Sequence, residues 1–259
     1  MLIVIPALNE QRSLGSLLDE IEAVRPGLGH TVDTVVIDDG STDETAALAE
    51  RRGVRVVRLG QNLGIGGAVQ TGLRIAFAER FDCAIQIDAD GQHPPSQIEQ
   101  LLAEMSGPSV PDLVVGSRRL KFEGYQSTPL RRLGQAWLRL CLLVVCRLRM
   151  TDPTSGFRLY GPRAVHLFQR TYPYDFPEPE SLAVARAFGL RIRETAVEMR
   201  PRQGGRSSIG GLKSIYYMAK VTLALALVYA RCRILDRRDI GGPPAVVELK
   251  GGERAQPTR

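Results

Sequence analysis

Apolar residues in the first half of the chain gather in short runs separated by longer mixed segments. The runs lie at residues 2–5, 34–37, 54–59, 84–87 and 112–115, and their length is typical of strands buried in a parallel sheet. The segments between them, at residues 11–25, 41–52, 67–79 and 94–105, are predicted to be helices; in the first of these, apolar residues recur at helical spacing. This alternation predicts an α/β fold with a Rossmann-like, doubly wound and mostly parallel sheet.

Polar side chains directly follow three of the predicted strands. Asn9 and Glu10 come after the first strand, Asp38 and Asp39 after the second, and Asp88-Ala89-Asp90 after the fourth. Ligands bind beyond the carboxyl ends of the strands in sheets of this kind. The sequence therefore predicts that three acidic strand ends converge on one ligand-binding edge.

Helix capping is an alternative explanation for some of these residues. Ser41-Thr42-Asp43-Glu44 has the spacing of a capping box and predicts that a helix begins there. Asn9 and Ser41 would then act as caps without any ligand. Capping explains the adjacent Asp38 and Asp39 less well, because two like charges side by side cost stability when neither has a partner.

The second half of the chain is less regular. Residues 133–148 and 212–230 predict two strongly apolar helices, residues 180–189 a further helix, and residues 191–199 a strand. We expect one domain over residues 1–210, with halves at 1–116 and 117–210. An amphipathic helix at 211–235 and a disordered, Gly/Pro-rich tail at 236–259 are expected to follow.

Charge also divides the chain near residue 116. Residues 1–116 hold 8 Lys/Arg and 17 Asp/Glu, whereas residues 117–259 hold 26 and 11, within a total net charge of +6. An acidic half suits a cation, and a basic half suits phosphates, an anionic membrane surface or nucleic acid, although ordinary solvated surface is the alternative. The four cysteines have no metal-ligand spacing, which indicates reduced thiols in a cytosolic compartment.

Asp88 and Asp90 are the candidate metal ligands. Residues two apart in extended backbone point to the same side, so the two carboxylates would face one cation. Mg²⁺ or Mn²⁺ prefers oxygen ligands, and Gln92 offers a further carbonyl oxygen. A solvated Asp pair in a loop is the alternative, but the position directly after a buried strand and beside Gly91 favours the metal.

A glycine-rich turn, Asn62-Leu-Gly-Ile-Gly-Gly67, precedes the third predicted helix. Its backbone, at Gly66 in particular, could approach a nucleotide closely. The turn lacks the GxGxxG order of a dinucleotide fold and the Lys-Ser/Thr of a P-loop, so it is a weak signal when taken alone.

Six motifs in order resemble those of the family 2 glycosyltransferases of the GT-A fold, and specifically the dolichyl/polyprenyl-phosphate sugar synthases. They are Val4-Ile-Pro-Ala-Leu-Asn-Glu10, Val36-Ile-Asp-Asp-Gly-Ser-Thr-Asp43, Asn62-Leu-Gly64, Asp88-Ala-Asp-Gly-Gln-His93, Gly116-Ser-Arg118 and Asp152-Pro-Thr-Ser-Gly-Phe-Arg158. The resemblance covers roughly residues 1–210. It implies an inverting transfer of a hexose from a UDP- or GDP-sugar, of the GDP-mannose or UDP-glucose type, with Mg²⁺ or Mn²⁺.

The resemblance also implies roles for individual residues. Donor contacts are expected at Pro6, Ala7, Asn9, Glu10, Asp38, Asp39, Gly66 and Ala89, and metal contacts at Asp88, Asp90 and Gln92. Phosphate contacts are expected at Arg118, Arg202, Arg206 and Ser207, with Arg131 or Arg132 as a further candidate. Asp90, Arg118 and Arg202 are the residues expected to take part most directly in catalysis. Residues 200–208 combine glycines, arginines and hydroxyls, which suits a loop that closes over phosphate.

The acceptor decides whether a general base is needed. Transfer to a hydroxyl requires a base, and Glu180 is the best carboxylate because the three histidines are poorly placed along the sequence. A polyprenyl phosphate needs no base, since a phosphate monoester with a second pKa of about 6 is already ionised at neutral pH. Abundant arginines and the lack of an obvious base favour the lipid phosphate. A saccharide or soluble hydroxyl acceptor, with Glu180 as base, remains the alternative.

Two apolar helices with basic and aromatic edges suggest peripheral association with the cytoplasmic face of a membrane. Packing on the protein's own core or across a homo-oligomer, or against a membrane-protein partner, is the alternative. No signal peptide is expected, because Met1 leads straight into a predicted strand, and no apolar run reaches about 18 residues.

Two other functions are disfavoured. A nucleotidyltransferase would carry a glycine-rich signature where Pro6-Ala-Leu-Asn9 stands. No nucleic-acid partner is expected, because few aromatic residues lie among the arginines of the basic half and no RNA- or DNA-binding motif is present.

Overall fold

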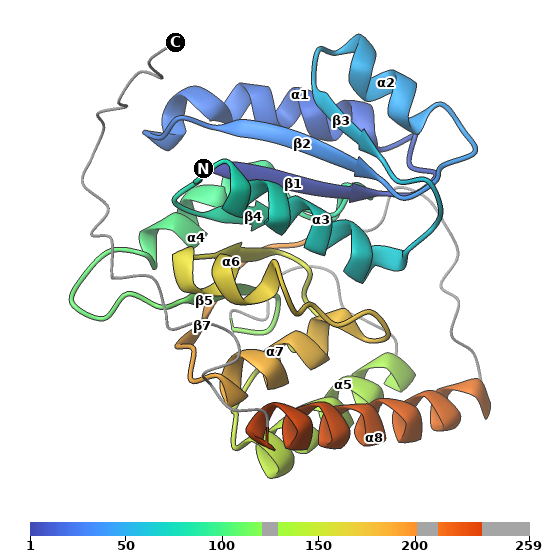
Figure 1. The fold of residues 1–259 in the computed structure, drawn as a ribbon, viewed down its shortest axis with the longest axis vertical. Helices are drawn as coiled ribbons and strands as arrows, with labels where there is room; N and C mark the ends of the chain where they lie inside the picture. The colour runs from blue at the N-terminus through green and yellow to red at the C-terminus, as the bar shows by residue number, and fades with distance from the viewer. Residues whose placement is uncertain (121–128, 201–211, 235–259) are drawn as a thin grey trace.

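The computed structural model describes residues 1–120, 129–200 and 212–234. These residues form a seven-stranded sheet in the order β3-β2-β1-β4-β6-β5-β7, with helices on both faces (Figure 1). The predicted doubly wound, mostly parallel sheet is confirmed. The predicted boundary at residue 116 falls at the end of a strand inside this one sheet.

The strands are β1 (Leu2–Ala7), β2 (Asp33–Asp38), β3 (Arg55–Arg58), β4 (Ala84–Gln86), β5 (Leu113–Ser117), β6 (Arg158–Tyr160) and β7 (Ile192–Ala196). The α-helices are α1 (Leu14–Val24), α2 (Thr45–Arg51), α3 (Gly64–Ala78), α4 (Ile98–Ala103), α5 (Pro129–Cys146), α6 (Pro162–Phe168), α7 (Pro177–Ala187) and α8 (Leu212–Ile234). Two 3₁₀ turns occur at Arg25–Leu28 and Pro95–Gln97.

Strand β1 shows why its apolar run is unbroken rather than alternating. Leu2 and Val4 pack on one face of the sheet, in a core shared with α3, α6 and α7. Ile3 and Ile5 pack on the other face, in a core shared with α1 and α4. Both faces of the strand are buried, so every position along it is apolar.

The three-residue strand β6 is the part of the sheet that the sequence does not predict. It pairs antiparallel with β4 on one side and with β5 on the other. Two of its side chains, Arg158 and Tyr160, are polar yet fully buried, because hydrogen bonds satisfy them. A strand of this length and polarity leaves no apolar run to recognise.

The predicted capping box does not form. Helix α2 begins at Thr45, and its N-cap residue Glu44 makes no side-chain capping bond. The Ser41 hydroxyl instead accepts a hydrogen bond from the backbone N–H of Asn9, 2.9 Å away. A long-range contact has therefore replaced the local one that the spacing suggested.

Two further helices differ from prediction. The glycine-rich turn is itself helical, since α3 begins at Gly64 rather than at residue 67. The predicted helix at 94–105 divides into the 3₁₀ turn at Pro95–Gln97 and the short helix α4.

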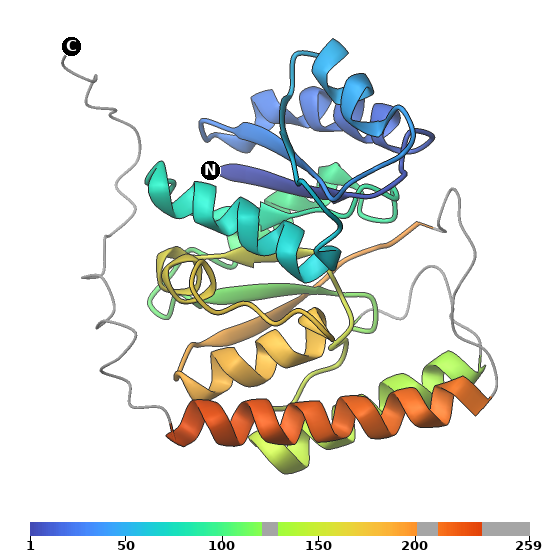
Figure 2. The same cartoon turned by 45° about the vertical axis from the view of Figure 1, so that its right-hand side comes forward.

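Helices α5, α7 and α8 gather at the β7 end of the sheet. In both views α5 and α8 lie side by side at the bottom of the molecule, and α7 lies between them and the sheet (Figures 1 and 2). Val221 and Leu225 of α8 are fully buried in this cluster. The two helices that the sequence suggests for a membrane surface therefore also bury one side in the protein's own core.

Helix α3 packs on β1 so closely that Gly72 has no room for a side chain. A Cβ atom there would lie 2.1 Å from Cγ1 of the buried Val4. We expect Gly72→Ala to lower the free energy of unfolding by about 2–3 kcal/mol, because a stiff β-branched side chain must move. The control Gly134→Ala in α5 meets nothing within 4 Å and should be neutral or stabilising. Urea unfolding of both variants tests this, and equal midpoints would contradict it.

Candidate active site

The site lies at the carboxyl edge of the sheet, where the chain leaves β1, β2 and β4. Strand β1 pairs in parallel with β2 on one side and with β4 on the other, so the three strands end at the same edge. The acidic segments that follow these strands are thereby brought together.

The loop after β1 is tied to the loop after β2. Asn9 adopts the left-handed conformation, with φ of 56°, and its side-chain oxygen accepts the backbone N–H of Thr42 at 2.9 Å. Glu10 donates its backbone N–H to the Thr45 hydroxyl at 2.8 Å. Asn9 and Ser41 therefore do not cap helices but hold two loops in one rigid rim.

Asp38 and Asp39 are both buried, and the structure gives each a backbone partner. Asp38 Oδ1 accepts the N–H of Ser41 at 3.2 Å, and Asp39 Oδ1 accepts the N–H of Leu63 at 2.7 Å. Asp39 thus links the end of β2 to the start of α3. These bonds compensate part of the cost of two adjacent charges, so their pairing alone does not require a ligand.

The small residues at the strand ends form the floor of this rim. Pro6 pairs with Ile37 within the sheet, Ala7 is 3% exposed, and Ala89 is 2% exposed.

The space beside Gly66, where a side chain would lie, is occupied by another part of the chain. A Cβ atom at Gly66 would lie 2.3 Å from the backbone oxygen of Pro173. The glycine is therefore required for the 171–176 segment to pack on the first turn of α3. Whether its backbone also contacts a nucleotide stays a prediction.

Asp88 and Asp90 form the acid pair of the predicted metal motif. The Asp88 carboxylate is partly open to solvent, with a side chain 25% exposed. Its Oδ1 accepts a hydrogen bond from Gln86 Nε2 at 3.1 Å. Gly156 lies against the same carboxylate, since a Cβ there would be 2.5 Å from Oδ2. Asp88 is therefore held between β4 and the segment that leads into β6.

Asp90 and Gln92 complete the predicted metal motif. Asp90 is 5% exposed, and its Oδ1 accepts the backbone N–H of Gln92 at 3.0 Å. Gln92 exchanges backbone and side-chain hydrogen bonds with the main chain of Arg200, through Arg200 N–H to Gln92 O and Gln92 Nε2 to Arg200 O. The motif is thus anchored to the point where residues 201–211 begin.

The acid pair fits a divalent cation that is shared with a ligand. Among the residues that the structure describes, no three His, Cys, Asp or Glu side chains gather into a complete metal site. Two carboxylates leave most of an octahedral coordination shell to be filled, and diphosphate oxygens are suitable ligands for it. The donor set is thus of hard oxygens and open on one side.

His93 lies between the acid pair and Arg118 but is buried and stacked on Phe157, with ring centroids 5.2 Å apart. Burial lowers the pKa of His93, and the charges of Asp88 and Asp90 oppose this shift only in part. Its Nδ1 accepts the backbone N–H of Asp88 at 3.2 Å, so the neutral ring carries its proton on Nε2. His93 therefore supports the turn after β4 and is not placed as an exposed general base.

Arg118, at the end of β5, forms a bidentate ion pair with the fully buried Asp152. Nε and Nη2 of the arginine donate to Oδ2 and Oδ1 at 2.5 and 2.7 Å, and Thr154 accepts a further bond from Nη2 at 2.9 Å. Burial would raise the pKa of Asp152, but the bonds and charge of Arg118 outweigh it and hold the pKa below its ordinary value. A guanidinium held in this way presents a pre-oriented edge to an anion.

Three more arginines lie around this pair. Burial lowers the pKa of Arg119, the positive charges of Arg139, Arg118 and Arg132 lower it further, and the charge of Asp152 opposes them. Arg132 and Arg139 belong to α5, so one helix and the end of β5 supply a cluster of positive charge. Arg119 and Arg139 were not among the predicted site residues, because their convergence depends on how α5 packs and leaves no local signal in the sequence.

The two glutamates of the Phe176-Pro-Glu-Pro-Glu180 segment have different surroundings. Burial raises the pKa of Glu178, Arg158 opposes the shift, and the charge of Asp88 adds to it. Burial and then Asp175 raise the pKa of Glu180 to about 7, while Lys220 of α8 opposes them. Glu178 is therefore within electrostatic reach of Asp88, although it was not among the predicted site residues.

Several predicted phosphate contacts cannot be placed. Arg202, Arg206 and Ser207 lie outside the described residues, as does the side chain of Arg131. Arg132 is described and exposed.

The family model described as Glycosyl transferase family 2 matches residues 2–165. An undecaprenyl-phosphate mannosyltransferase of Micrococcus luteus is 31% identical over 221 residues, which cover 82% of this chain and 88% of the relative. A UDP-N-acetylglucosamine–dolichyl-phosphate N-acetylglucosaminyltransferase of Methanococcus voltae is 27% identical over 218 residues, with 76% and 84% covered.

Solved structures agree on the fold. Glucosyl-3-phosphoglycerate synthase of Mycobacterium tuberculosis, in complex with Mn²⁺, UDP and phosphoglyceric acid, superposes with a TM-score of 0.65. The match covers 91% of this chain and 79% of that one at 24% sequence identity. The likeness identifies the fold as GT-A.

Gly156 gives a direct test of the acid pair. We expect Gly156→Ala to lower the affinity for Mn²⁺ by about 10-fold, because the new methyl group displaces the Asp88 carboxylate. Isothermal titration with Mn²⁺ in the presence of UDP or GDP measures this, and Gly27→Ala, which meets nothing within 4 Å, is the control. Wild-type affinity in a folded Gly156→Ala protein would contradict the placement of Asp88 as a ligand.

Proposed function

The chain belongs to glycosyltransferase family 2, and from this premise we propose that it transfers a hexose from a nucleotide-sugar to a polyprenyl phosphate by an inverting reaction. The observation that carries the proposal is the pairing of two subsites at one edge of the sheet. The acid pair Asp88 and Asp90 suits a cation with a diphosphate, and the arginine cluster around Arg118 suits a second phosphate.

The donor would bind over the rim formed by the loops after β1 and β2. Buried carboxylates at Asp38 and Asp39 suit the neutral hydrogen-bond donors of a ribose or a nucleobase. A bound Mg²⁺ or Mn²⁺ would neutralise charge that develops on the nucleoside diphosphate leaving group. Asp88 and Asp90 would hold that ion, with Gln92 nearby.

A phosphate acceptor explains the positive side of the site. Arg118 is pre-oriented by Asp152, and Arg119, Arg132 and Arg139 add positive charge that stabilises a phosphate dianion. The anion attacks without a base, so no side chain has to remove a proton. The names of two relatives, which act on undecaprenyl and dolichyl phosphate, support this acceptor class.

A hydroxyl acceptor is the second candidate, and one observation favours it. The carboxyl of Glu180 has a pKa of about 7, which suits a general base near neutral pH. Its Oε1 atom is buried with no hydrogen-bond partner among the described residues. The charges of Asp175 and of Lys220 in α8 act on Glu180, whereas the charge of Asp88 acts on Glu178.

The surface formed by α5 and α8 suits peripheral contact with an anionic membrane. Exposed apolar residues recur at helical spacing on both helices: Leu133, Trp137, Leu140 and Val144 on α5, and Leu223, Leu227 and Ile234 on α8. Trp137 Nε1 donates to the Thr222 hydroxyl at 2.9 Å and joins the two helices.

The charge of these two helices supports the same partner. Residues 129–146 and 212–234 contain seven Lys/Arg and no Asp or Glu. Basic side chains beside an apolar stripe favour binding to the surface of an anionic bilayer. No described helix is both long enough and apolar enough to cross a bilayer. We propose that the cytoplasmic face is the one contacted.

The transfer is tested with labelled UDP- and GDP-sugars and a polyprenyl phosphate. We expect a lipid-extractable product with one donor and its loss on addition of EDTA, because the diphosphate requires the cation. Glu180→Gln should retain this activity, since a phosphate nucleophile needs no base. Chelator-insensitive transfer, or a product found only in the aqueous phase and abolished by Glu180→Gln, would favour the second candidate.

The membrane surface is tested by vesicle flotation. Wild-type protein should float with vesicles that contain phosphatidylglycerol and float less with neutral vesicles or in 1 M salt. The double variant Val144→Ser/Leu227→Ser should bind about 10-fold more weakly, because two exposed apolar side chains are lost. Phe77→Ser removes an apolar side chain of α3 that is 44% exposed and serves as the control. Equal loss in both variants would argue against this surface.

A further inference from the structure

A series of buried polar side chains, joined by hydrogen bonds, ends on the carboxylate of Asp88. Gln86 lies two residues before Asp88, at the end of β4, and donates from Nε2 to Asp88 Oδ1 at 3.1 Å. The Gln86 side chain is 2% exposed, so water does not compete for this bond. The contact fixes one oxygen of a carboxylate that otherwise stands at the open edge of the sheet.

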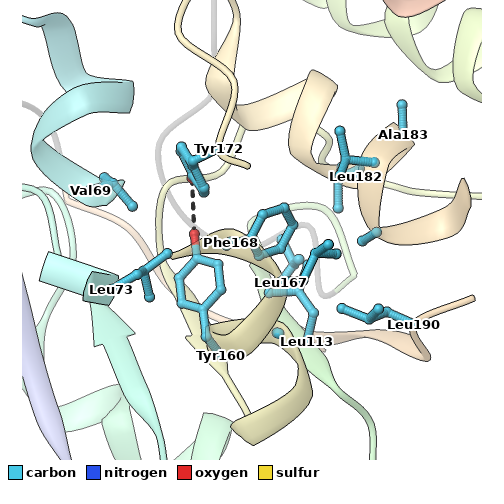
Figure 3. Close-up of a cluster of buried hydrophobic side chains, with 14 of the residues drawn as sticks. Val69, Leu73, Leu113, Tyr160, Leu167, Phe168, Tyr172, Leu182, Ala183 and Leu190 are labelled. Carbon is cyan, nitrogen blue, oxygen red and sulfur yellow. Dashed lines mark hydrogen bonds between the residues drawn. The ribbon is translucent and has the colours of Figure 1, made fainter. Parts of the chain in front are cut away.

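Two tyrosines continue the chain into the core. The Tyr160 hydroxyl lies 2.9 Å from Gln86 Oε1. The Tyr172 hydroxyl lies 3.1 Å from that of Tyr160, as the dashed line in Figure 3 shows. The three side chains come from β4, from β6 and from the segment that follows α6. The antiparallel pairing of β6 with β4 brings Tyr160 near Gln86.

The direction of these bonds follows from the chemistry of the groups. An amide oxygen can only accept, so the single hydroxyl proton of Tyr160 must point to Gln86. Tyr160 then accepts from Tyr172, and Gln86 presents its N–H groups to Asp88. Every donor in the chain therefore points toward the carboxylate, and aligned hydrogen bonds of this kind strengthen one another.

Burial keeps both tyrosines protonated. It raises the pKa of Tyr160 and raises that of Tyr172 well above its usual range. Phe168 packs edge-on against both rings, at centroid distances of 5.9 and 5.3 Å (Figure 3). The rings are thus fixed by packing, and the hydroxyls have no route to rotate into solvent.

We propose that Gln86, Tyr160 and Tyr172 are positioning residues that hold the Asp88 carboxylate in the orientation in which it binds the divalent cation. The inference rests on the proposed function, because it takes Asp88 as a metal ligand. A neutral amide suits this role, since a lysine or arginine at position 86 would cancel the negative charge that attracts the cation. This relay, the hydrogen-bonded series Tyr172–Tyr160–Gln86, thus orients the Asp88 carboxylate without neutralising its charge.

The test measures Mn²⁺ affinity rather than turnover. Free Mn²⁺ is followed by its electron paramagnetic resonance signal, with whichever of UDP and GDP strengthens Mn²⁺ binding to the wild type. Gln86→Met should weaken binding by about 10-fold, a size typical for loss of a residue that supports a metal ligand. Tyr160→Phe should weaken it by roughly threefold and Tyr172→Phe by less, because each removes a bond farther from Asp88.

Tyr174→Phe is the matched control. The Tyr174 hydroxyl donates to Gln70 Oε1 at 2.6 Å, which is the same type of bond in the same segment but outside the relay. Its Mn²⁺ affinity should equal that of the wild type. Thermal unfolding of each variant shows that the protein is folded, and nucleotide affinity without metal should stay unchanged.

The outcomes separate two failures. If the wild type and Asp88→Asn bind Mn²⁺ with the same affinity, the proposed metal site itself is wrong. If the wild type binds Mn²⁺ and folded Gln86→Met and Tyr160→Phe bind it equally well, only the positioning role is refuted. Should Gln86→Met not fold, Tyr160→Phe decides alone, since it removes one oxygen atom and keeps the ring.

Discussion

The contact between the Asp88 carboxylate and Gly156 is the constraint on which the rest of the site depends. It joins the end of β4 to the segment that leads into β6, and no side chain fits between them. The same segment carries Asp152, whose buried carboxylate orients Arg118. The acidic and basic parts of the site are therefore held in register by one short stretch of backbone. A shift of that stretch would move both parts together.

This arrangement explains why the two halves of the chain differ in net charge. Both halves contribute strands to one sheet, and the acidic half supplies Asp88 and Asp90 while the basic half supplies Arg118 at the end of β5. A reaction between a diphosphate and a phosphate has to bring two anions together. Carboxylates that hold a cation on one side, and arginines on the other, give each anion its own counter-charge. The segregation in sequence thus corresponds to two adjacent subsites.

The parts of this molecule that can be read from the sequence are those with a local signature. Strands buried on both faces leave short, mostly apolar runs, and parallel pairing then places Asp38, Asp39 and Asp88 at one edge. The capping box was misread because the Ser41 hydroxyl is used by Asn9, 32 residues away in sequence. The short strand β6, the arginines around Arg118 and the bond from Gln86 to Asp88 depend on packing between distant segments. No periodicity or spacing reports such contacts.

The position of β6 also has a consequence for the order in which the chain can fold. Strands β4 and β5 are neighbours in sequence, but each pairs with β6 and not with the other. Until residue 160 leaves the ribosome, β4 keeps one unpaired edge, and β5 has neither β6 nor the later strand β7 to pair with. The N-terminal half alone would therefore expose backbone that can pair with other chains. Closure of the sheet is a late event with high contact order, and it coincides with assembly of the site.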